Sequence, residues 1–198
     1  MKLAFLGGSF NPVHNAHIML AVQAANQYAY DTVLLIPAWQ PPHKKLAEGA
    51  SAQDRLAMLN AALEETGDKR LHADDCELLR GGVSYTIDTL HFLKKRFAGQ
   101  LEGKIGIILG SDLIDGFAKW KQADLLSREA DLLLALRPAA ETTEAQSFLQ
   151  PHKILHNELY NISSERIRRL IAQNGEWKEL VPQSVYRYIS ERNLYGFK

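Results

Sequence analysis

One junction near the start of the sequence constrains the fold more than any other segment: an apolar strand runs through paired glycines into a helix. Residues 2–6 read as the strand, Gly7 and Gly8 follow, and apolar residues at helical spacing begin at Ile18. Paired glycines let the backbone approach a ligand closely, because they carry no Cβ. A helix that starts after a strand offers unpaired N–H groups and the positive end of its dipole, which suit a phosphate. The junction therefore predicts a nucleotide-phosphate site that begins at residue 7.

Two histidines stand where this helix is expected to begin. His14 and His17 are three residues apart, so both rings can lie on one face of the first turn and reach one anion. The segment is not a P-loop, since no Gly-Lys-Ser/Thr follows, and it lacks the G-x-G-x-x-G fingerprint of dinucleotide sites. A zinc site is a weaker alternative, because the sequence nearby has neither His-Glu-x-x-His spacing nor a third ligand. The simplest alternative is a tight turn with two surface histidines.

Short apolar runs alternate with segments of helical spacing along the chain. The predicted strands cover residues 2–6, 32–36, 70–73, 104–109 and 131–136, and the predicted helices cover residues 18–28, 51–65 and 85–97. This order is typical of an α/β fold, here a Rossmann-like, doubly wound and mainly parallel sheet with helices on both faces. Ligands of such sheets lie beyond the carboxyl ends of the strands. The candidate functional residues follow strands in this way, at residues 7–17, 37–45, 110–112 and 137.

The composition is that of one globular domain. We find no linker or repeat, so residues 1–198 are interpreted as a single domain with a helical C-terminal part over about residues 160–198. Residues 138–150 are polar and poorly patterned, which predicts a surface excursion. Lys plus Arg and Asp plus Glu both number 23, so the net charge is zero. That balance argues against nucleic acid or a membrane surface as the main partner.

The sequence also bears on the compartment. Cys76 is the only cysteine, which excludes an internal disulfide and suits a reducing compartment. The first six residues are strand-like and do not form a signal peptide, and no apolar run is long enough for a membrane span. We therefore expect a cytoplasmic protein. The sequence does not fix the oligomeric state and leaves room for a homo-oligomer.

Two further segments carry candidate phosphate ligands. A proline-rich loop after the second predicted strand presents Lys44, whose ammonium can bind a phosphate as a point charge. Near residue 163, Ser163 and Ser164 precede Arg168, and a helix that starts there would combine free N–H groups with a forked guanidinium. The alternatives are a rigid loop with solvated lysines and a plain helix cap made by the serines.

Motifs distributed over nearly the whole chain combine into one pattern. Two of them are Gly7-Gly8-Ser9-Phe10-Asn11-Pro12-x-His14-x-x-His17 and Ile162-Ser163-Ser164-x-x-Ile167-Arg168. The others are Ile36-Pro37, Pro41-Pro42-His43-Lys44, Ser84-Tyr85-Thr86-x-Asp88-Thr89-Leu90, Gly110-x-Asp112, Phe117-x-x-Trp120, Arg137-Pro138, Val185-x-x-Tyr188-Ile189 and Leu194-Tyr195. The first two resemble the HIGH-motif nucleotidyltransferases. The full set, in the same order, resembles the bacterial nicotinate mononucleotide adenylyltransferases within that superfamily.

The resemblance implies adenylyl transfer. The phosphate of nicotinate mononucleotide would attack the α-phosphorus of ATP, giving nicotinate adenine dinucleotide and pyrophosphate, a step of NAD biosynthesis. Catalysis would then be positioning and charge neutralisation. Mg²⁺ would be carried mostly by phosphate oxygens, with no protein ligand. A bound phosphate should also raise the pKa of a nearby histidine above about 6.5 and favour its donor form.

The resemblance also assigns residues to roles. The phosphates would be held by the catalytic residues His14, His17, Lys44 and Arg168, with His17 facing the transferring group. ATP would be bound by Gly7, Gly8, Ser9, Phe10, Gly110, Ser111, Asp112, Arg137, Ile162, Ser163 and Ser164. Nicotinate mononucleotide would be bound by Asn11, Ser84, Tyr85, Thr86, Trp120 and Lys121. Among these, Trp120 would stack on the pyridine ring, and backbone N–H groups around Thr86 and Lys121 would receive its carboxylate.

Two positions depart from the family pattern. Ala16 stands between the histidines where glycine is usual, and its methyl group would narrow the adenosine pocket or clash with the base. Glu165 follows the two serines where threonine is usual. A carboxylate suits the first turn of a helix, but it would repel an incoming triphosphate unless it points away. Both departures bear on ATP affinity and turnover more than on the reaction class.

Other functions remain open at this point. The same chemistry could act on nicotinamide mononucleotide or phosphopantetheine, although the segment at residues 84–86 and Trp120 favour a pyridine nucleotide. A nucleotide-binding paralogue weakened by Ala16 and Glu165 is a second alternative. A metal-dependent hydrolase that uses the two histidines is a third, and it lacks further ligands in sequence range.

Overall fold

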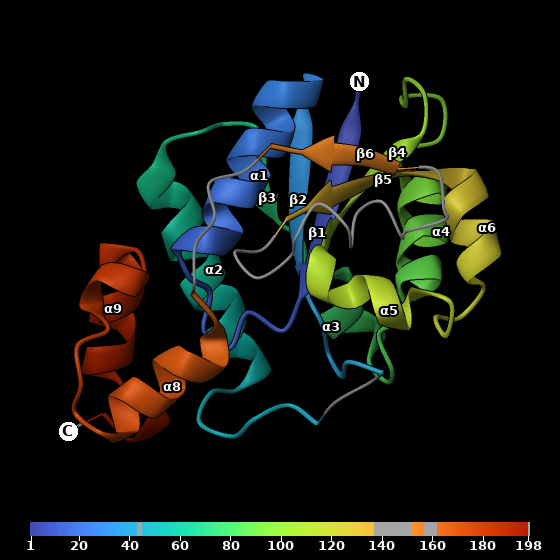
Figure 1. The fold of residues 1–198 in the computed structure, drawn as a ribbon. Helices are drawn as coiled ribbons and strands as arrows, with labels where there is room; N and C mark the ends of the chain where they lie inside the picture. Colours follow the sequence, from blue (N-terminus) through green and yellow to red (C-terminus); the bar gives the residue numbers. More distant parts are fainter. Residues whose placement is uncertain (43–44, 137–151, 157–161, 198) are drawn as a thin grey trace.

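A six-stranded sheet forms the centre of the molecule (Figure 1). The computed structural model describes residues 1–42, 45–136, 152–156 and 162–197. The strands are β1 (Leu3–Gly8), β2 (Thr32–Pro37), β3 (Leu71–Ala73), β4 (Ile105–Gly110), β5 (Ala130–Ala135) and β6 (His152–Leu155). Their order is β3-β2-β1-β4-β5-β6, and every adjacent pair is parallel. This topology confirms the predicted Rossmann-like, doubly wound fold.

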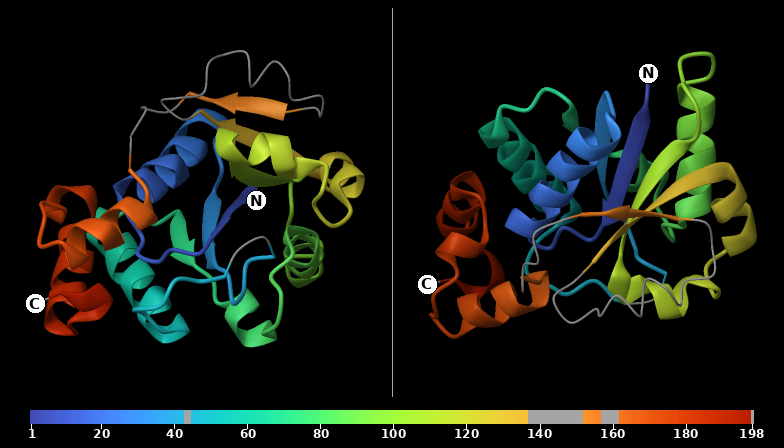
Figure 2. Two further views of the ribbon diagram at one scale, coloured as in Figure 1. Left: turned by 60° about the horizontal axis from the view of Figure 1, so that its bottom comes forward. Right: turned by 45° about the horizontal axis from the view of Figure 1, so that its top comes forward.

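Helices cover both faces of the sheet. The described helices are α1 (Asn15–Tyr28), α2 (Ala52–Thr66), α3 (Cys76–Arg80), α4 (Thr86–Arg96), α5 (Ile114–Phe117), α6 (Ala123–Glu129), α8 (Ser164–Ala172) and α9 (Gln183–Glu191), with 3₁₀ turns η1 (Ser111–Leu113), η2 (Lys178–Leu180) and η3 (Leu194–Gly196). Helices α1 and α2 lie on one side of the sheet, and α4 and α6 lie on the other (Figure 1). Helices α8 and α9 stand beside α2 in every view (Figures 1 and 2).

Alternate residues of each strand supply the two halves of the core. Ala4 and Leu6 of β1 pack in the half that contains α1, α2, α8 and α9, whereas Leu3 and Phe5 pack in the half that contains α4 and α6. Because both faces are buried, the strands read as continuous apolar runs rather than as alternating ones. This burial explains why apolar runs alone could locate β1, β2, β4 and β5.

Strand β6 was missed by the sequence analysis. Its four residues pair with β5 at the edge of the sheet, and of them only Leu155 is buried. No apolar run therefore marks the strand. Its backbone is anchored instead by α1, since Gln27 and Tyr28 both donate to the carbonyl oxygen of Ile154. The predicted surface excursion at residues 138–150 lies outside the described residues.

Strands β1 and β4 meet at the centre of the sheet, and a glycine there has a steric cause. Gly106 of β4 pairs with Ala4 of β1. The buried Tyr30 ring lies over it, and a Cβ added to Gly106 would lie 2.6 Å from the Tyr30 Cζ. Any larger residue would push the tyrosine off the seam between the two halves of the sheet.

Hydrogen bonds near both ends of α2 connect it to α9. The Glu65 carboxylate, near the C-terminal end of α2, accepts hydrogen bonds from the N–H groups of Gln183 (3.1 Å) and Ser184 (2.7 Å) at the start of α9. At the other end, the Tyr188 hydroxyl donates to Asp54 at 3.0 Å. Between these contacts, apolar side chains of α9 enter the core. The two helices are therefore antiparallel, and α2 fixes the position of the C-terminal helices.

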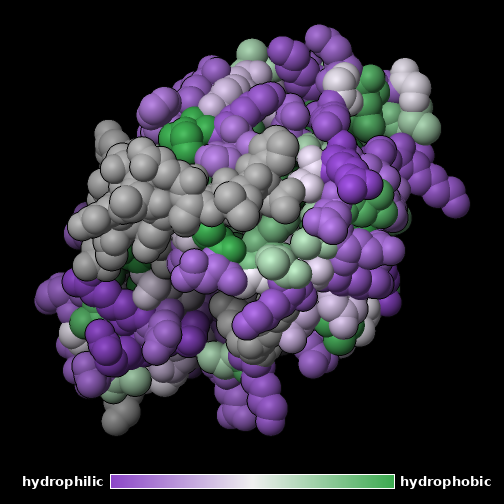
Figure 3. All heavy atoms as spheres, turned by 45° about the vertical axis from the view of Figure 1, so that its right-hand side comes forward, coloured by the Kyte–Doolittle hydropathy of each residue, from purple (hydrophilic) through white to green (hydrophobic). Residues whose placement is uncertain are grey.

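Within the part of the chain that the structure describes, no helix is long and apolar enough to cross a membrane. On the face shown in Figure 3, hydrophobic side chains form small groups between hydrophilic ones. The exposed large hydrophobic side chains among the described residues are Trp39, Leu79, Val83, Phe92 and Leu113.

The contact between Glu65 and α9 predicts a pH-dependent loss of stability. Replacing Glu65 by alanine leaves two N–H groups without their carboxylate, and the free energy of unfolding should fall by about 1 kcal/mol at neutral pH. Burial alone would raise the pKa of Glu65, but the hydrogen bonds from α9 outweigh it and hold the pKa below its usual range. The contribution is therefore present above about pH 4.3 and is lost as the pH falls through the lower pKa of the folded state.

Urea denaturation of the wild type and Glu65→Ala at several pH values measures this effect. The difference between the two should shrink below about pH 4. Glu64→Ala is the matched control, because Glu64 is the exposed neighbouring carboxylate on the same helix. An equal loss of stability in both variants would show that the cap on α9 is not the cause.

Candidate active site

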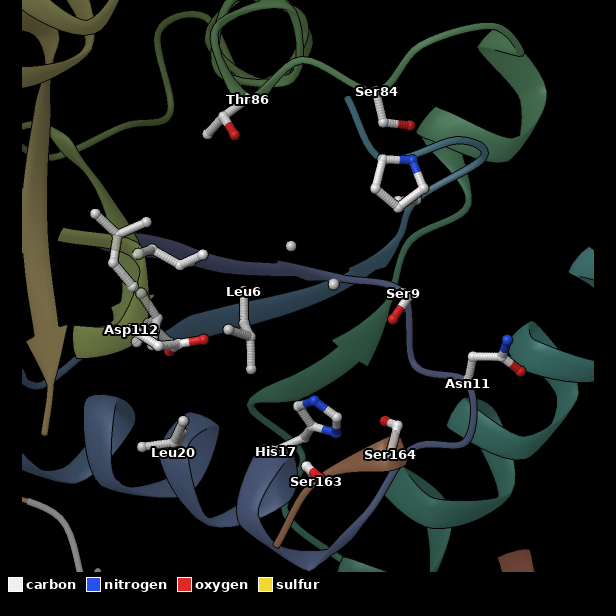
Figure 4. A pocket seen from close by; sticks show the side chains of 18 of the residues that line it. Leu6, Ser9, Asn11, His17, Leu20, Ser84, Thr86, Asp112, Ser163 and Ser164 are labelled. Atoms are coloured by element: carbon white, nitrogen blue, oxygen red, sulfur yellow. The ribbon is translucent and has the colours of Figure 1, made fainter. Parts of the chain in front are cut away.

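A cavity of about 840 Å³ opens at the carboxyl ends of β1 and β4. The winding of the sheet reverses between these two strands, which is where doubly wound folds bind ligands. Gly7 and Gly8 line one side, and Gly110 and Asp112 line another. The volume lies in the range of small-molecule sites. In Figure 4, Ser84 and Thr86 lie across the cavity from His17 and Ser163, with Leu6 and Asp112 between them.

Three helices begin at the wall of this cavity. The first turns of α1, α4 and α8 contribute His17, Thr86 and Ser164 respectively. Each helix presents N–H groups and the positive end of its dipole at its start. Their convergence makes the cavity electrostatically suited to an anion with several charges, although the chain as a whole is neutral.

The two histidines lie face to face. The ring centroids of His14 and His17 are 3.6 Å apart with an interplanar angle of 21°, and the edge of Phe10 packs against His17. The backbone N–H of His14 donates to Nδ1 of His17 at 3.3 Å. Because Nδ1 accepts, neutral His17 carries its proton on Nε2 and can donate from that atom. The predicted shared face of the first turn is confirmed.

Side chains from distant segments hold the loop between β1 and α1. Arg55 of α2 donates to the carbonyl oxygen of Ser9 at 2.7 Å, and Arg168 of α8 donates to that of Asn11 at 2.6 Å. The Ser164 hydroxyl donates to the carbonyl oxygen of Pro12 at 2.8 Å. Arg55 is only 2% exposed, and burial lowers the pKa of its guanidinium. We refer to residues 9–12, where the sequence predicts a phosphate site, as the phosphate loop.

The two serines of the C-terminal segment have structural partners as well as cavity positions. Ser163 is the N-cap of α8, and its hydroxyl oxygen accepts from the backbone N–H of Arg166 at 3.2 Å. This contact confirms the helix-cap interpretation of Ser163. Together with Ile162, both serines line the cavity, and so does Arg168. The start of α8 therefore forms part of the cavity wall beside α1.

The far end of the cavity combines an aromatic ring with polar backbone. Trp120 lines the cavity and lies against the buried Phe117, with ring centroids 5.3 Å apart. The Lys121 ammonium is 3.0 Å from both carboxylate oxygens of Asp88 and lies over the Tyr85 ring. Since Asp88 neutralises this lysine, recognition of an anionic group here would fall to backbone N–H groups at the start of α4.

Most of the predicted site residues meet in this one cavity. Those that line it are Gly7, Gly8, Ser9, Asn11, His14, His17, Ser84, Tyr85, Thr86, Gly110, Asp112, Trp120, Lys121, Ile162, Ser163, Ser164 and Arg168. Phe10 and Ser111 are buried beside it and do not line it. The predicted Lys44 and Arg137 lie outside the described residues.

The structure adds residues that sequence reasoning missed. Lys45 and Glu77 line the cavity, and Arg55 holds the phosphate loop from behind. Glu77 is buried and accepts a hydrogen bond from the Thr89 hydroxyl at 2.5 Å. A charged residue on an apolar helical face, as Arg55 is with Met58 and Leu59 three and four positions on, was the available signal for a buried cation. Ala16 and Glu165 also line the cavity.

Comparison with known proteins places the chain in a family. The cytidylyltransferase-like family matches residues 5–170. A protein of Borreliella afzelii named probable nicotinate-nucleotide adenylyltransferase is 36% identical, over 98% of this chain and 97% of its own length. A protein of Synechococcus sp. with the same name is 38% identical, over 98% and 96%. The chain belongs to the nicotinate-nucleotide adenylyltransferase family. The resemblance inferred from the motifs is thereby confirmed.

A solved structure has a similar fold at low sequence identity. The nicotinic acid mononucleotide adenylyltransferase of Plasmodium falciparum in complex with NaAD matches 100% of this chain and 98% of its own, with a TM-score of 0.82. Its sequence identity is 20%, so the likeness concerns the fold. The adenylyltransferase fold thus extends over the whole described chain, including α8 and α9.

The geometry of Gly7 predicts a variant that affects binding without affecting the fold. Gly7 is exposed at the end of the otherwise buried β1, lines the cavity, and has no atom within 4 Å of the position that a Cβ would occupy. In Gly7→Ala the methyl group would therefore enter ligand space. Isothermal titration with ATP should show binding at least about tenfold weaker, a cost in the range of about 1–3 kcal/mol for overpacking.

The matched control is Gly116→Ala. Gly116 also has no atom within 4 Å of the position that a Cβ would occupy, but it lies in α5 and does not line the cavity. We expect unchanged ATP affinity in this variant and a normal melting temperature in both. Normal ATP affinity in Gly7→Ala would mean that the ligand does not pass close to residue 7.

Proposed function

We propose that this chain transfers AMP from ATP to nicotinate mononucleotide, forming nicotinate adenine dinucleotide and pyrophosphate. The observation that carries the proposal is a single cavity with two chemically different ends. One end has His14, His17, Arg168 and two helix N-termini, which suit phosphates. The other end has Trp120 and the start of α4, which suit a planar ring with an anionic substituent.

The reaction needs no protein nucleophile. An oxygen of the mononucleotide phosphate forms a bond to the α-phosphorus of ATP. The bond from that phosphorus to the oxygen that joins it to the β-phosphorus breaks, and this oxygen leaves with pyrophosphate. His17 can donate from Nε2 to the transferring phosphoryl group, while the helix N-termini and Arg168 bind the remaining negative charge. Lys44 would add a further cation. The protein's contribution is thus orientation and charge neutralisation in a preformed cavity.

Magnesium is proposed as a companion of ATP rather than as a resident metal. Beside many apolar side chains, the described cavity lining offers imidazole, guanidinium and ammonium nitrogens and several serine hydroxyls, and its carboxylates are Glu77, Asp112 and Glu165. In the described part of the chain, no group of three or more His, Cys, Asp or Glu side chains could hold a metal ion. Such a donor set fits phosphate oxygens, and Mg²⁺ bound to those oxygens would neutralise part of their charge.

Recognition of the adenosine is proposed at the β4 end of the cavity. Asp112 is exposed to the cavity and follows β4, where it could accept hydrogen bonds from the ribose or the base. Gly110, Ser111 and Arg137 would form its surroundings. Ala16 lines the same cavity from the first turn of α1, so its methyl group can contact the adenosine without a change in the fold.

Pyrophosphate release tests the proposed function directly. ATP and Mg²⁺ are supplied with nicotinate mononucleotide or nicotinamide mononucleotide in parallel. We expect release with a strong preference for the acid. Equal rates with the two mononucleotides would show that the protein does not select the acid. ATP binding without pyrophosphate release in either reaction would favour a nucleotide-binding paralogue.

The geometry of His17 predicts a large loss of turnover when its ring is removed. In His17→Ala, kcat should fall by about 10²–10³-fold, as for other donors aimed at a transferring group. The control is His72→Ala, since His72 is an exposed histidine of β3 outside the cavity. Near-normal turnover in a His17→Ala protein with an unchanged circular dichroism spectrum would refute the assigned role.

The position of Trp120 predicts a selective effect on the mononucleotide. Stacking of an aromatic side chain on a base contributes about 1–3 kcal/mol, so Trp120→Ala should raise KM for nicotinate mononucleotide at least about fivefold and leave KM for ATP almost unchanged. Trp39→Ala serves as the control, because Trp39 is 43% exposed and does not line the cavity. Equal losses for both substrates would contradict the stacking role.

A further inference from the structure

The Asn11 side chain is held between two segments that are far apart in sequence. Its Nδ2 donates to the carbonyl oxygen of Ala47 at 2.8 Å, and its Oδ1 accepts from the Tyr195 hydroxyl at 2.7 Å. Asn11 lines the cavity yet is only 2% exposed. Both ends of the amide therefore have a partner on the protein, and its orientation is fixed before any ligand arrives.

Tyr195 is itself held in an unusual conformation. Its φ of 58° lies in the left-handed region, which a bulky residue rarely adopts. The ring is 8% exposed and packs against Gly49, where a Cβ would lie 2.7 Å from the Tyr195 Cδ1. Such backbone conformations persist where the surroundings over-determine them. Burial also raises the pKa of the hydroxyl, so it stays protonated and remains a donor.

These contacts converge on the phosphate loop. The carbonyl oxygen of Asn11 accepts from Arg168, a proposed phosphate ligand, while its side chain accepts from Tyr195. A change in the orientation of Asn11 would therefore move the carbonyl that positions the Arg168 guanidinium. The Tyr195 hydroxyl touches Asn11 and does not line the cavity.

We infer that Tyr195 is a positioning residue for adenylyl transfer: through Asn11 it fixes the phosphate loop and the Arg168 guanidinium. The inference rests on the proposed function for its effect on turnover. The clamp itself, by which we mean the hold of Tyr195 on Asn11, is independent of that function because the hydrogen bond forms in the protein without ligand. Tyr195 acts on catalysis through Asn11 and makes no contact with the substrates.

Tyr195→Phe removes the hydroxyl and keeps the ring that packs on Gly49. We expect kcat/KM to fall about five- to tenfold, the effect of losing one buried hydrogen bond, with most of the change in kcat. The matched control is Tyr188→Phe, which removes the hydroxyl that donates to Asp54 and lies outside the cavity. This control should lose stability to a similar degree and keep its kcat/KM within about twofold.

A double-mutant cycle separates positioning from a merely structural role. If Tyr195 acts through Asn11, then Tyr195→Phe should cause no further loss of kcat/KM in an Asn11→Ala background. Full additivity of the two losses would overturn the inference. An effect of Tyr188→Phe on kcat/KM as large as that of Tyr195→Phe would also overturn it, because lost stability would then explain both.

Hydrogen exchange of the protein without ligand tests the clamp independently of turnover. Backbone amides in a peptide that covers residues 7–14 should exchange faster in Tyr195→Phe than in the wild type or in Tyr188→Phe. Unchanged exchange would overturn the inference whatever the activity. A wild type that releases no pyrophosphate would overturn the proposed function instead, and the exchange measurement would still decide whether Tyr195 clamps the loop.

Discussion

The site depends on how briefly β1 and β4 pair. Strand β1 pairs with β2 over six positions and β4 pairs with β5 over six, but β1 and β4 pair only at Ala4 with Gly106 and at Phe5 with Ile107. Beyond Phe5 the two strands part, and the cavity occupies the opening between their carboxyl ends. At this short seam, Gly106 leaves room for the Tyr30 ring. The two halves of the sheet are therefore in contact at residues 4–5 and 106–107 and separate beyond them, where a ligand can enter.

Around this opening, the positive potential comes from oriented helix N-termini rather than from an excess of basic residues. The chain carries equal numbers of acidic and basic residues, yet three helices point their N-termini at one cavity. Oriented N–H groups in a partly buried site act on an anion more strongly than solvated lysines do, because water screens them less. A neutral protein can thereby bind two anionic nucleotides without a basic surface that would attract other polyanions.

The fold and most of the cavity could be predicted from the sequence because both depend on patterns among residues that are close together in the chain. Apolar runs mark buried strands, paired glycines mark a close approach, and three-residue spacing placed His14 and His17 on one face. It could not reach contacts that exist only after folding. Two examples are the cap that Glu65 gives to α9 and the hydrogen bond from Arg55 to the carbonyl oxygen of Ser9. In both, the two partners are far apart in the chain, and no local sequence pattern links them. Strand β6 was not predicted for a related reason, because its pairing with β5 and not its own composition makes it a strand.

The hydrogen bond between Tyr195 and Asn11 joins residues 184 positions apart. Contacts of such long sequence separation cost the most chain entropy to close and tend to form late in folding. The sheet can therefore be largely assembled while the phosphate loop still lacks its last support. A ligand that binds the finished cavity stabilises the docked C-terminal helices together with the sheet. Nucleotides, the proposed substrates, would then also favour the last step of folding of this protein.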